Sequence, residues 1–129
     1  MSSERRQYPR IVTDASIQII DESGRALPAV AVDISLLGVQ LLCDALTARQ
    51  VTAQLAAGHD KVHVRVPIEA EEDVEAYCRV IYFRHLPKDE CRLGLQYQQF
   101  VGASYDCLEG FIDQNLSYPE EALLSATSH

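Results

Sequence analysis

The sequence has no long apolar run and no excess of basic residues. Because no apolar run approaches the ~20 residues of a membrane-spanning helix, we expect no membrane insertion. The first residues, MSSERRQY, lack the apolar segment of a secretion signal, so we expect a cytoplasmic protein. Eleven Lys and Arg stand against nineteen Asp and Glu, a formal charge of −8, which argues against DNA or RNA as a partner.

Paired cysteines are also missing from the chain. Four cysteines are spread along it without a C-x-x-C motif: Cys43, Cys78, Cys91 and Cys107. In a reducing compartment such cysteines are most simply small buried hydrophobic residues. His85 and Cys91 flank a turn, but two ligands are too few for a zinc site, so we expect no metal.

The sequence offers no catalytic constellation either. A nucleophile needs a base within reach, and the four histidines fall in turns, on an exposed strand face or at the terminus. Asp33 and Ser35, the polar pair discussed below, therefore have no histidine partner. We expect neither an enzyme nor a cofactor.

What the chain does contain is a series of alternating apolar and polar residues. A period of two is typical of strands with one buried face. It occurs in these stretches: 11–20, 30–35, 38–43, 62–68, 74–84 and 91–100. Short turn signals, such as DESG and PKDE, separate them. A 129-residue chain with five to seven such strands predicts one all-β domain, a closed or nearly closed antiparallel barrel.

After the strands the period changes to that of a helix. Apolar residues then recur every three or four positions: Leu108, Phe111, Ile112 and Leu116. This spacing predicts an amphipathic helix over 103–116 that covers the barrel. Beyond it we expect one further helical turn near 119–124 and then disorder. The stretch 44–50 is compatible with a helical turn or with a loop.

Near the N-terminus, the stretch ERRQYPR at 4–10 concentrates positive charge in an acidic protein. It holds Arg5, Arg6 and Arg10, whose planar forks can meet two phosphate oxygens or the N7/O6 edge of a guanine. We expect residues 1–10 to form a flexible arm. The alternative is a solvated basic terminus with no ligand.

A second polar stretch, DISLLG at 33–38, closes the second predicted strand. Alternation puts one set of residues toward the core and the other outward: Val30, Val32 and Ile34 inward, and Ala31, Asp33 and Ser35 outward. Arg10 is expected on the same outward face. A carboxylate there can accept both N–H groups of a guanine edge, and Gly38 suits a tight turn. The alternative is a plain serine turn ended by glycine.

Together the two stretches resemble the signatures of the PilZ domain, a bacterial receptor module for cyclic di-GMP. The R-x-x-x-R signature is present as Arg6–Arg10, and [D/N]-x-S-x-x-G as Asp33–Gly38. RLGLQY at 92–97 resembles a late strand of the family. The resemblance implies a six-stranded antiparallel PilZ-type β-barrel with a C-terminal helix, in agreement with the periodicity.

The resemblance also implies a role for each signature residue. Arg6 and Arg10 would grip phosphate and guanine, and Arg5 would assist. The remaining positions have their own roles: Asp33 and Ser35 would take a guanine edge, and Gly38 would shape the turn. Arg79, on an outward face, and Arg92, beside Gly94, are further candidates.

The sequence thus predicts an arm at 1–10, a barrel with its helix at 11–116, and a tail at 117–129. We expect a cyclic di-GMP receptor or adaptor whose arm becomes ordered by ligand and which signals through a partner protein. Homodimerisation stays open, and Ile81 and Phe83 are candidates for the contact. The alternative is a PilZ-fold interaction module that binds no nucleotide.

Overall fold

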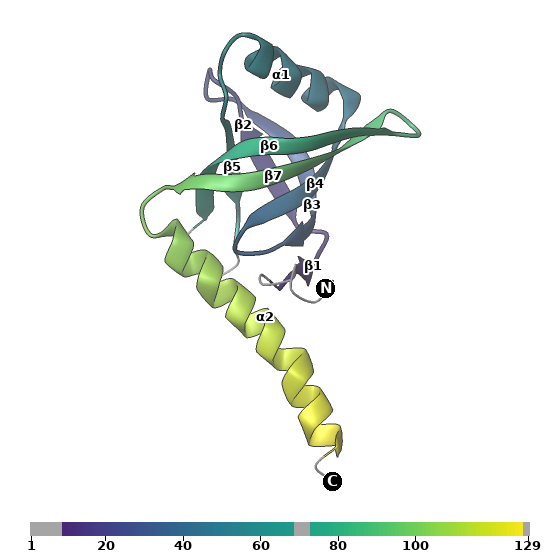
Figure 1. The fold of residues 1–129 in the computed structure, drawn as a ribbon, viewed down its shortest axis with the longest axis vertical. Helices are drawn as coiled ribbons and strands as arrows, with labels where there is room; N and C mark the ends of the chain where they lie inside the picture. The colour runs from purple at the N-terminus through teal and green to yellow at the C-terminus, as the bar shows by residue number, and fades with distance from the viewer. Residues whose placement is uncertain (1–8, 69–72, 128–129) are drawn as a thin grey trace.

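The computed structural model describes residues 9–68 and 73–127, with side chains of the last helix described as far as 115. Its elements follow one another along the chain (Figure 1): β1 (Ile11–Val12), β2 (Ser16–Ile20), β3 (Ala26–Ile34), β4 (Gly38–Asp44), α1 (Ala45–Ala56), β5 (Val62–Val66), β6 (Val74–Leu86), β7 (Glu90–Phe100) and α2 (Ser104–Thr127). Of the predicted arm, residues 1–8 lie outside the described part.

The strands form the predicted six-stranded antiparallel barrel. The order β3-β2-β5-β6-β7-β4 closes because β4 also pairs with β3. The short β1 lies on the same edge of β3 as β2, since Ile11 pairs with Ile34 while Ser16 pairs with Val30. β1 and β2 are therefore two parts of the one predicted first strand, interrupted between them.

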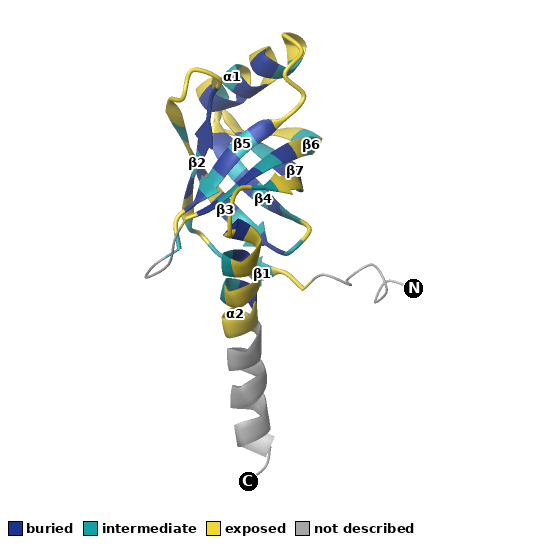
Figure 2. Cartoon of the chain, turned by 90° about the vertical axis from the view of Figure 1, so that its left-hand side faces the viewer, coloured by how far each residue is buried: buried dark blue, intermediate teal, exposed yellow. Residues whose placement is uncertain are grey.

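Alternation predicts the buried face of most strands correctly. Figure 2 shows the buried residues concentrated in the barrel strands and on one side of α1. Inward residues on β4, β5 and β7 are almost inaccessible to solvent: Val39, Leu41, Val62, Val64, Leu93 and Leu95. These side chains fill the barrel, and their burial supplies the main hydrophobic stabilisation of the fold.

In β3 the predicted alternation is wrong over its central part. Ala31 is fully buried rather than outward, whereas Val30 is 39% exposed and Val32 only partly buried. A β-bulge lies between Ala31 and Asp33, and it shifts the pairing with β4. A bulge adds one residue to one strand, so it exchanges the faces of the residues that follow. Ile34 consequently points inward, as predicted, and Asp33 points outward.

One end of the barrel is closed by α1, the stretch that the sequence left undecided. Asp44 caps this helix, because its Oδ1 accepts a hydrogen bond of 2.8 Å from the Thr47 backbone N–H. That bond lowers the pKa of Asp44. Ala48 and Val51 are buried against the barrel. Small and polar residues make up much of the buried side of α1, so its sequence has no apolar stripe that would predict a helix.

The second helix, α2, begins at the opposite end of the barrel from α1 (Figure 1). Leu108 and Ile112 are buried, as the predicted stripe requires. The helix continues to Thr127, beyond the expected end at 116. Its last part contains EEALL, residues with high helix propensity. Among the described residues, no helix has the length and apolarity needed to cross a membrane.

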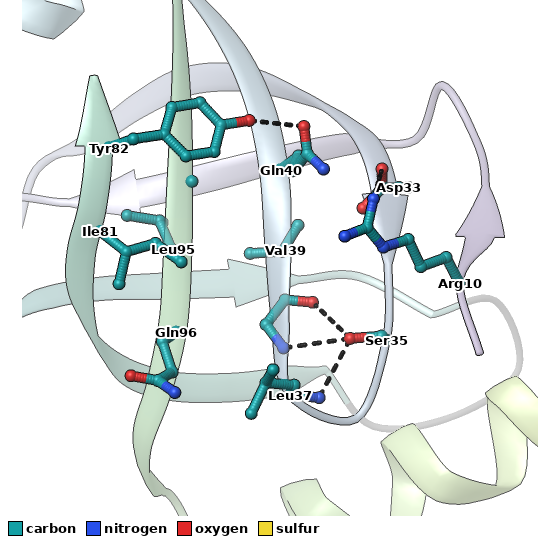
Figure 3. A pocket seen from close by; sticks show the side chains of 12 residues that line it. Arg10, Asp33, Ser35, Leu37, Val39, Gln40, Ile81, Tyr82, Leu95 and Gln96 are labelled. Atoms are coloured by element: carbon teal, nitrogen blue, oxygen red, sulfur yellow. Dashed lines mark hydrogen bonds and ion pairs between the residues drawn. The ribbon is translucent and has the colours of Figure 1, made fainter. Parts of the chain in front are cut away.

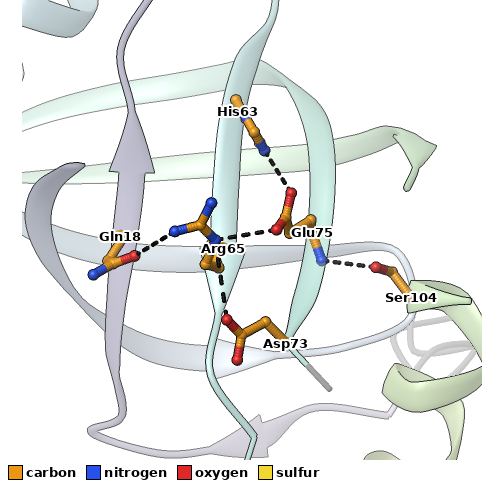
Figure 4. Close-up of polar contacts among 6 residues, drawn as sticks. All are labelled: Gln18, His63, Arg65, Asp73, Glu75 and Ser104. Carbon is orange, nitrogen blue, oxygen red and sulfur yellow. Dashed lines mark hydrogen bonds and ion pairs between the residues drawn. The ribbon is translucent and has the colours of Figure 1, made fainter. Parts of the chain in front are cut away.

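A polar network ties the start of α2 to the outer face of β5 and β6 (Figure 4). His63 and Arg65 each lie 3.1 Å from a carboxylate oxygen of Glu75. These contacts, that of His63 first, lower the pKa of Glu75. The Glu75 backbone N–H donates to the Ser104 hydroxyl at 2.8 Å. His63 and Arg65 are thus both engaged by a carboxylate of the same chain.

A backbone contact at Gly38 sets the distance between β4 and β7. A Cβ atom built on this residue would lie 2.0 Å from the carbonyl oxygen of Leu95, far closer than any real contact. Gly38, predicted to shape a turn, therefore also lets two neighbouring strand backbones lie close together. Any side chain there forces the two strands apart.

We expect Val51→Ala to lower the free energy of unfolding by about 2–3 kcal/mol, through lost burial and a cavity. Leu46→Ala is the matched control on the same helix, because Leu46 is 64% exposed. It should change stability by less than about 0.5 kcal/mol. Urea unfolding of both variants measures the difference. Equal effects would mean that α1 is not part of the core.

We expect Gly38→Ala to destabilise the protein strongly, because the added methyl group meets the Leu95 carbonyl. Gly110→Ala is the control: a Cβ there has no neighbour within 4 Å, and the residue lies within α2. Alanine within a helix favours the folded state over glycine by about 0.5–1 kcal/mol, so this variant should be slightly more stable than the parent. Thermal melts of the two variants should therefore shift in opposite directions.

Candidate functional site

Four residues on neighbouring strands form one row across the outer face of the barrel. Asp33 on β3 pairs with Gln40 on β4, Gln40 with Gly94 on β7, and Gly94 with Tyr82 on β6. An open pocket lies along this row and is also lined by Arg10 (Figure 3). The residues that line it come from distant parts of the sequence.

The structure brings Arg10 and Asp33 together at one end of this pocket. Arg10 directly precedes β1, whose Val12 pairs with Asp33. The Arg10 Nη1 atom lies 3.8 Å from the Asp33 Oδ2 atom, and Figure 3 shows the arginine side chain directed toward the carboxylate. The Arg10 side chain is 47% exposed and that of Asp33 is 15% exposed. The guanidinium is therefore free to reach a ligand, while the carboxylate stands in a partly desolvated position. Arg5 and Arg6 lie outside the described residues.

Ser35 lines the same pocket, but its hydroxyl is engaged by its own turn. Ser35 Oγ accepts hydrogen bonds from the backbone N–H groups of Leu37, at 3.0 Å, and Gly38, at 3.2 Å. The residue is only 7% exposed, although it lines the pocket. The serine turn that the sequence offered as an alternative is thus present. It holds the loop between β3 and β4.

Tyr82 forms the opposite wall of the pocket, and sequence reasoning did not find it. Its ring lies against Gly94, where a Cβ would come within 2.2 Å of the ring atom Cε2. The Tyr82 hydroxyl donates a hydrogen bond to the Gln40 side-chain oxygen (Figure 3). A glycine inside a strand often marks such a close approach, so Gly94 was the available signal.

The remaining wall of the pocket combines polar and apolar side chains. Gln96 lines it and accepts a hydrogen bond of 2.9 Å from Arg79, one of the further arginines that the sequence suggested. Ile81 also lines it and is 54% exposed, as predicted for a contact residue. Phe83, the other predicted contact residue, packs partly buried against the core. The pocket can therefore hold a ligand with both polar edges and a flat apolar face.

No metal centre is found in the part of the chain that the structure describes. His85 Nδ1 lies 3.5 Å from Cys91 Sγ, but no group of three metal-ligating side chains occurs there. Burial raises the pKa of Cys43 and of Cys78 to about 12, which keeps both thiols protonated.

Comparisons with solved structures identify proteins of the same fold. The inhibitor of motility MotI/DgrA of Bacillus subtilis superposes with a TM-score of 0.63 at 18% identity, over 88% of this chain and 53% of that one. YcgR of Escherichia coli, in complex with c-di-GMP, gives 0.60 at 17% identity, over 96% and 50%. Both matches therefore span about half of the longer protein.

The isolated PilZ domain of Escherichia coli YcgR, also with c-di-GMP, gives a TM-score of 0.53 at 18% identity, and the match covers 95% of this chain and 97% of that domain. A comparison with curated protein sequences found no match. The family model of the PilZ domain matches residues 4–114, which include both signatures and the whole barrel. The chain therefore belongs to the PilZ domain family.

Proposed function

We propose that this chain is a bacterial, cytoplasmic receptor for cyclic di-GMP that acts as an adaptor and not as an enzyme. The observation that carries the proposal is the meeting of Arg10 and Asp33 at the mouth of a pocket on the outer barrel face. These residues belong to the two signatures of the family, and they are far apart in sequence. Family membership and the c-di-GMP complexes of related folds support the same ligand.

The chemistry of the pair suits a guanine nucleotide. A carboxylate only accepts hydrogen bonds, and the Watson–Crick edge of guanine offers two adjacent N–H donors. The arginine only donates, and it can meet phosphate oxygens or the N7/O6 edge. At 3.8 Å the two side chains form a loose ion pair, so ligand binding need not break a strong contact. Asp33 and Arg10 therefore take complementary edges of the same ligand.

The turn between β3 and β4 contributes indirectly. Ser35 ties the backbone N–H groups of Leu37 and Gly38 into a fixed loop. Gly38 holds that loop against β7. Both residues thus keep Asp33 at the pocket. A direct contact of the Ser35 hydroxyl with guanine stays a prediction, and it requires one of these turn bonds to open.

We further propose that ligand recruits the N-terminal arm. Arg5 and Arg6 stand in a stretch whose other members are mostly polar, SSERRQ, and bring little apolar surface of their own. Phosphate supplies the anion that would hold these arginines on the barrel. Ordering of the arm would create a new surface next to exposed Leu37 and Ile81, where a partner protein can bind.

The second candidate is an interaction module that binds no nucleotide. The observation in its favour is that Leu37 and Ile81, 45% and 54% exposed, border the same pocket. Such side chains also suit a constitutive protein contact. Calorimetric titration with cyclic di-GMP separates the two candidates, because only the receptor gives a heat signal that saturates with ligand.

Arg10→Ala and Asp33→Ala should each weaken cyclic di-GMP binding. Hydrogen bonds to charged groups contribute about 1.5–3 kcal/mol. That range corresponds to a loss of roughly 10- to 150-fold in affinity. Melting temperatures should change little, because Arg10 is half exposed and the pair is loose. Titration calorimetry and a thermal melt measure both quantities.

Arg25→Ala is the matched control for this pair. Arg25 also forms an ion pair with an aspartate, Asp21, at 3.3 Å, and it lies outside the pocket. Its removal should leave the affinity unchanged. Unchanged affinity in Arg10→Ala and Asp33→Ala would place the ligand elsewhere, and unfolding of those variants would make the residues structural.

Amide hydrogen exchange should show whether the arm becomes ordered on ligand binding. We expect residues 1–9 to exchange fast without ligand and to become protected when cyclic di-GMP is added. In Arg6→Ala the protection should be lost or reduced even at saturating ligand. Exchange at the same rate in both states would refute the ordering mechanism, although it would leave ligand binding itself intact.

A further inference from the structure

The barrel wall is open along part of the contact between β3 and β4. β3 pairs with β2 over residues 26–30. Among the described residues, its pairing with β4 begins at Val30, which lies opposite Leu42. Beyond Leu42, β4 continues to Asp44 and pairs there with β7. Residues 26–29 of β3 therefore form a strand edge with no strand beside it on the β4 side.

The backbone of this edge directs hydrogen-bonding groups toward the opening. At the end of the β2–β3 ladder, the Ala31 N–H donates to the Ala15 carbonyl at 2.8 Å. Hydrogen bonds alternate along an antiparallel ladder, so the odd-numbered residues of β3 before the bulge bond to β2 and the even-numbered ones face away from it. The N–H and C=O of Ala26 and the C=O of Pro28 consequently point into the opening. Within the described chain no strand pairs with them.

A groove of about 580 Å³, the β3 groove, lies along this edge. It shares no residue with the pocket of Arg10 and Asp33. Val30 is 39% exposed there, which is unusual for a valine inside a barrel strand. Most of the lining is apolar and comes from three strands: Ile17, Leu27, Pro28, Ala29, Val30 and Leu42.

The charged residues that line the β3 groove, Asp44 and Glu90, are both acidic. They lie directly opposite each other on β4 and β7. Like charges in such positions destabilise a sheet. In the part of the chain that the structure describes, neither forms an ion pair, although Arg92 lies in the next row of the sheet. A cation that binds here therefore meets two carboxylates and breaks no existing ion pair.

We propose that the β3 groove binds an extended segment of a partner protein in which apolar and basic residues alternate. The free edge of β3 offers backbone pairing, which selects an extended segment. The apolar lining receives one face of that segment, and the carboxylates of Asp44 and Glu90 receive lysine or arginine on the other face. The proposal does not depend on cyclic di-GMP binding.

A second copy of this chain fits the β3 groove less well than a basic partner. Its formal charge of −8 repels a like molecule. Pro28 has no N–H, so two β3 edges that meet lack a donor on each side, and proline on an edge strand commonly prevents such self-pairing. A partner segment that itself supplies N–H donors can still bond to the carbonyls of Ala26 and Pro28.

The test is an NMR titration of the isotope-labelled full chain with synthetic peptides. The probe has about six residues, alternately valine and lysine, because an extended segment of that length spans the edge. We expect the amide signals of Ala26, Leu27 and Val30 to shift and to saturate. A peptide of the same composition, with its valines and lysines in separate blocks, should leave these signals in place.

Variants test the charge and the apolar contact separately. Glu90→Gln should weaken binding of the probe roughly two- to fivefold, the range for an exposed ion pair. Glu109→Gln, an exposed glutamate outside the groove, is its control. Val30→Thr places a hydroxyl in the groove and should weaken binding roughly fivefold. Val12→Thr, at a position that is 84% exposed and outside the groove, should have no effect.

Several outcomes would overturn the proposal. No shift with the probe, equal shifts with the block peptide, or equal shifts when glutamate replaces lysine would each do so. Shifts confined to the pocket of Arg10 and Asp33, or equal losses in variants and controls, would place the peptide elsewhere. Signals of the groove that move with protein concentration alone would assign the groove to a second copy. Each of these results leaves the calorimetric test of cyclic di-GMP binding unaffected.

Discussion

The bulge in β3 is the constraint on which the site depends. It lies between Ala31, which is fully buried, and Asp33, which faces outward. In a regular strand these two residues would share one face. The extra residue turns the Asp33 carboxylate out of the core and toward Arg10, while Ile34 returns to the core. Without the bulge the carboxylate would be buried without a partner, at a high cost in free energy.

Two glycines let the surface around Asp33 become a pocket. Gly38 allows β4 to approach the Leu95 carbonyl, and Gly94 leaves room for the ring of Tyr82. Gly38 lets β4 and β7 lie close together. The absence of a side chain at Gly94 leaves space for the Tyr82 ring, which forms one wall of the pocket. The two glycines thus determine the shape of the pocket, while other residues supply its polar groups.

The charge distribution fits an anionic ligand despite the net charge of −8. Arg79 joins the pocket through Gln96, and Arg84 and Arg92 lie just beyond Tyr82. Several arginines therefore lie on or beside this face of an acidic molecule. Cations grouped in this way favour an anionic ligand, such as the cyclic di-GMP proposed above.

Alternation and the two signatures were sufficient to predict the six-stranded barrel, most of the buried faces and the start of α2. These features depend on local pattern, because a buried strand face must be apolar. Tertiary structure alone decided four features: the bulge, the hydrogen bonds that Ser35 makes within its turn, the helix α1 and the wall formed by Tyr82. Each depends on which strand lies beside which, and at what register, and residues as distant as Gln40 and Tyr82 meet only when the barrel closes.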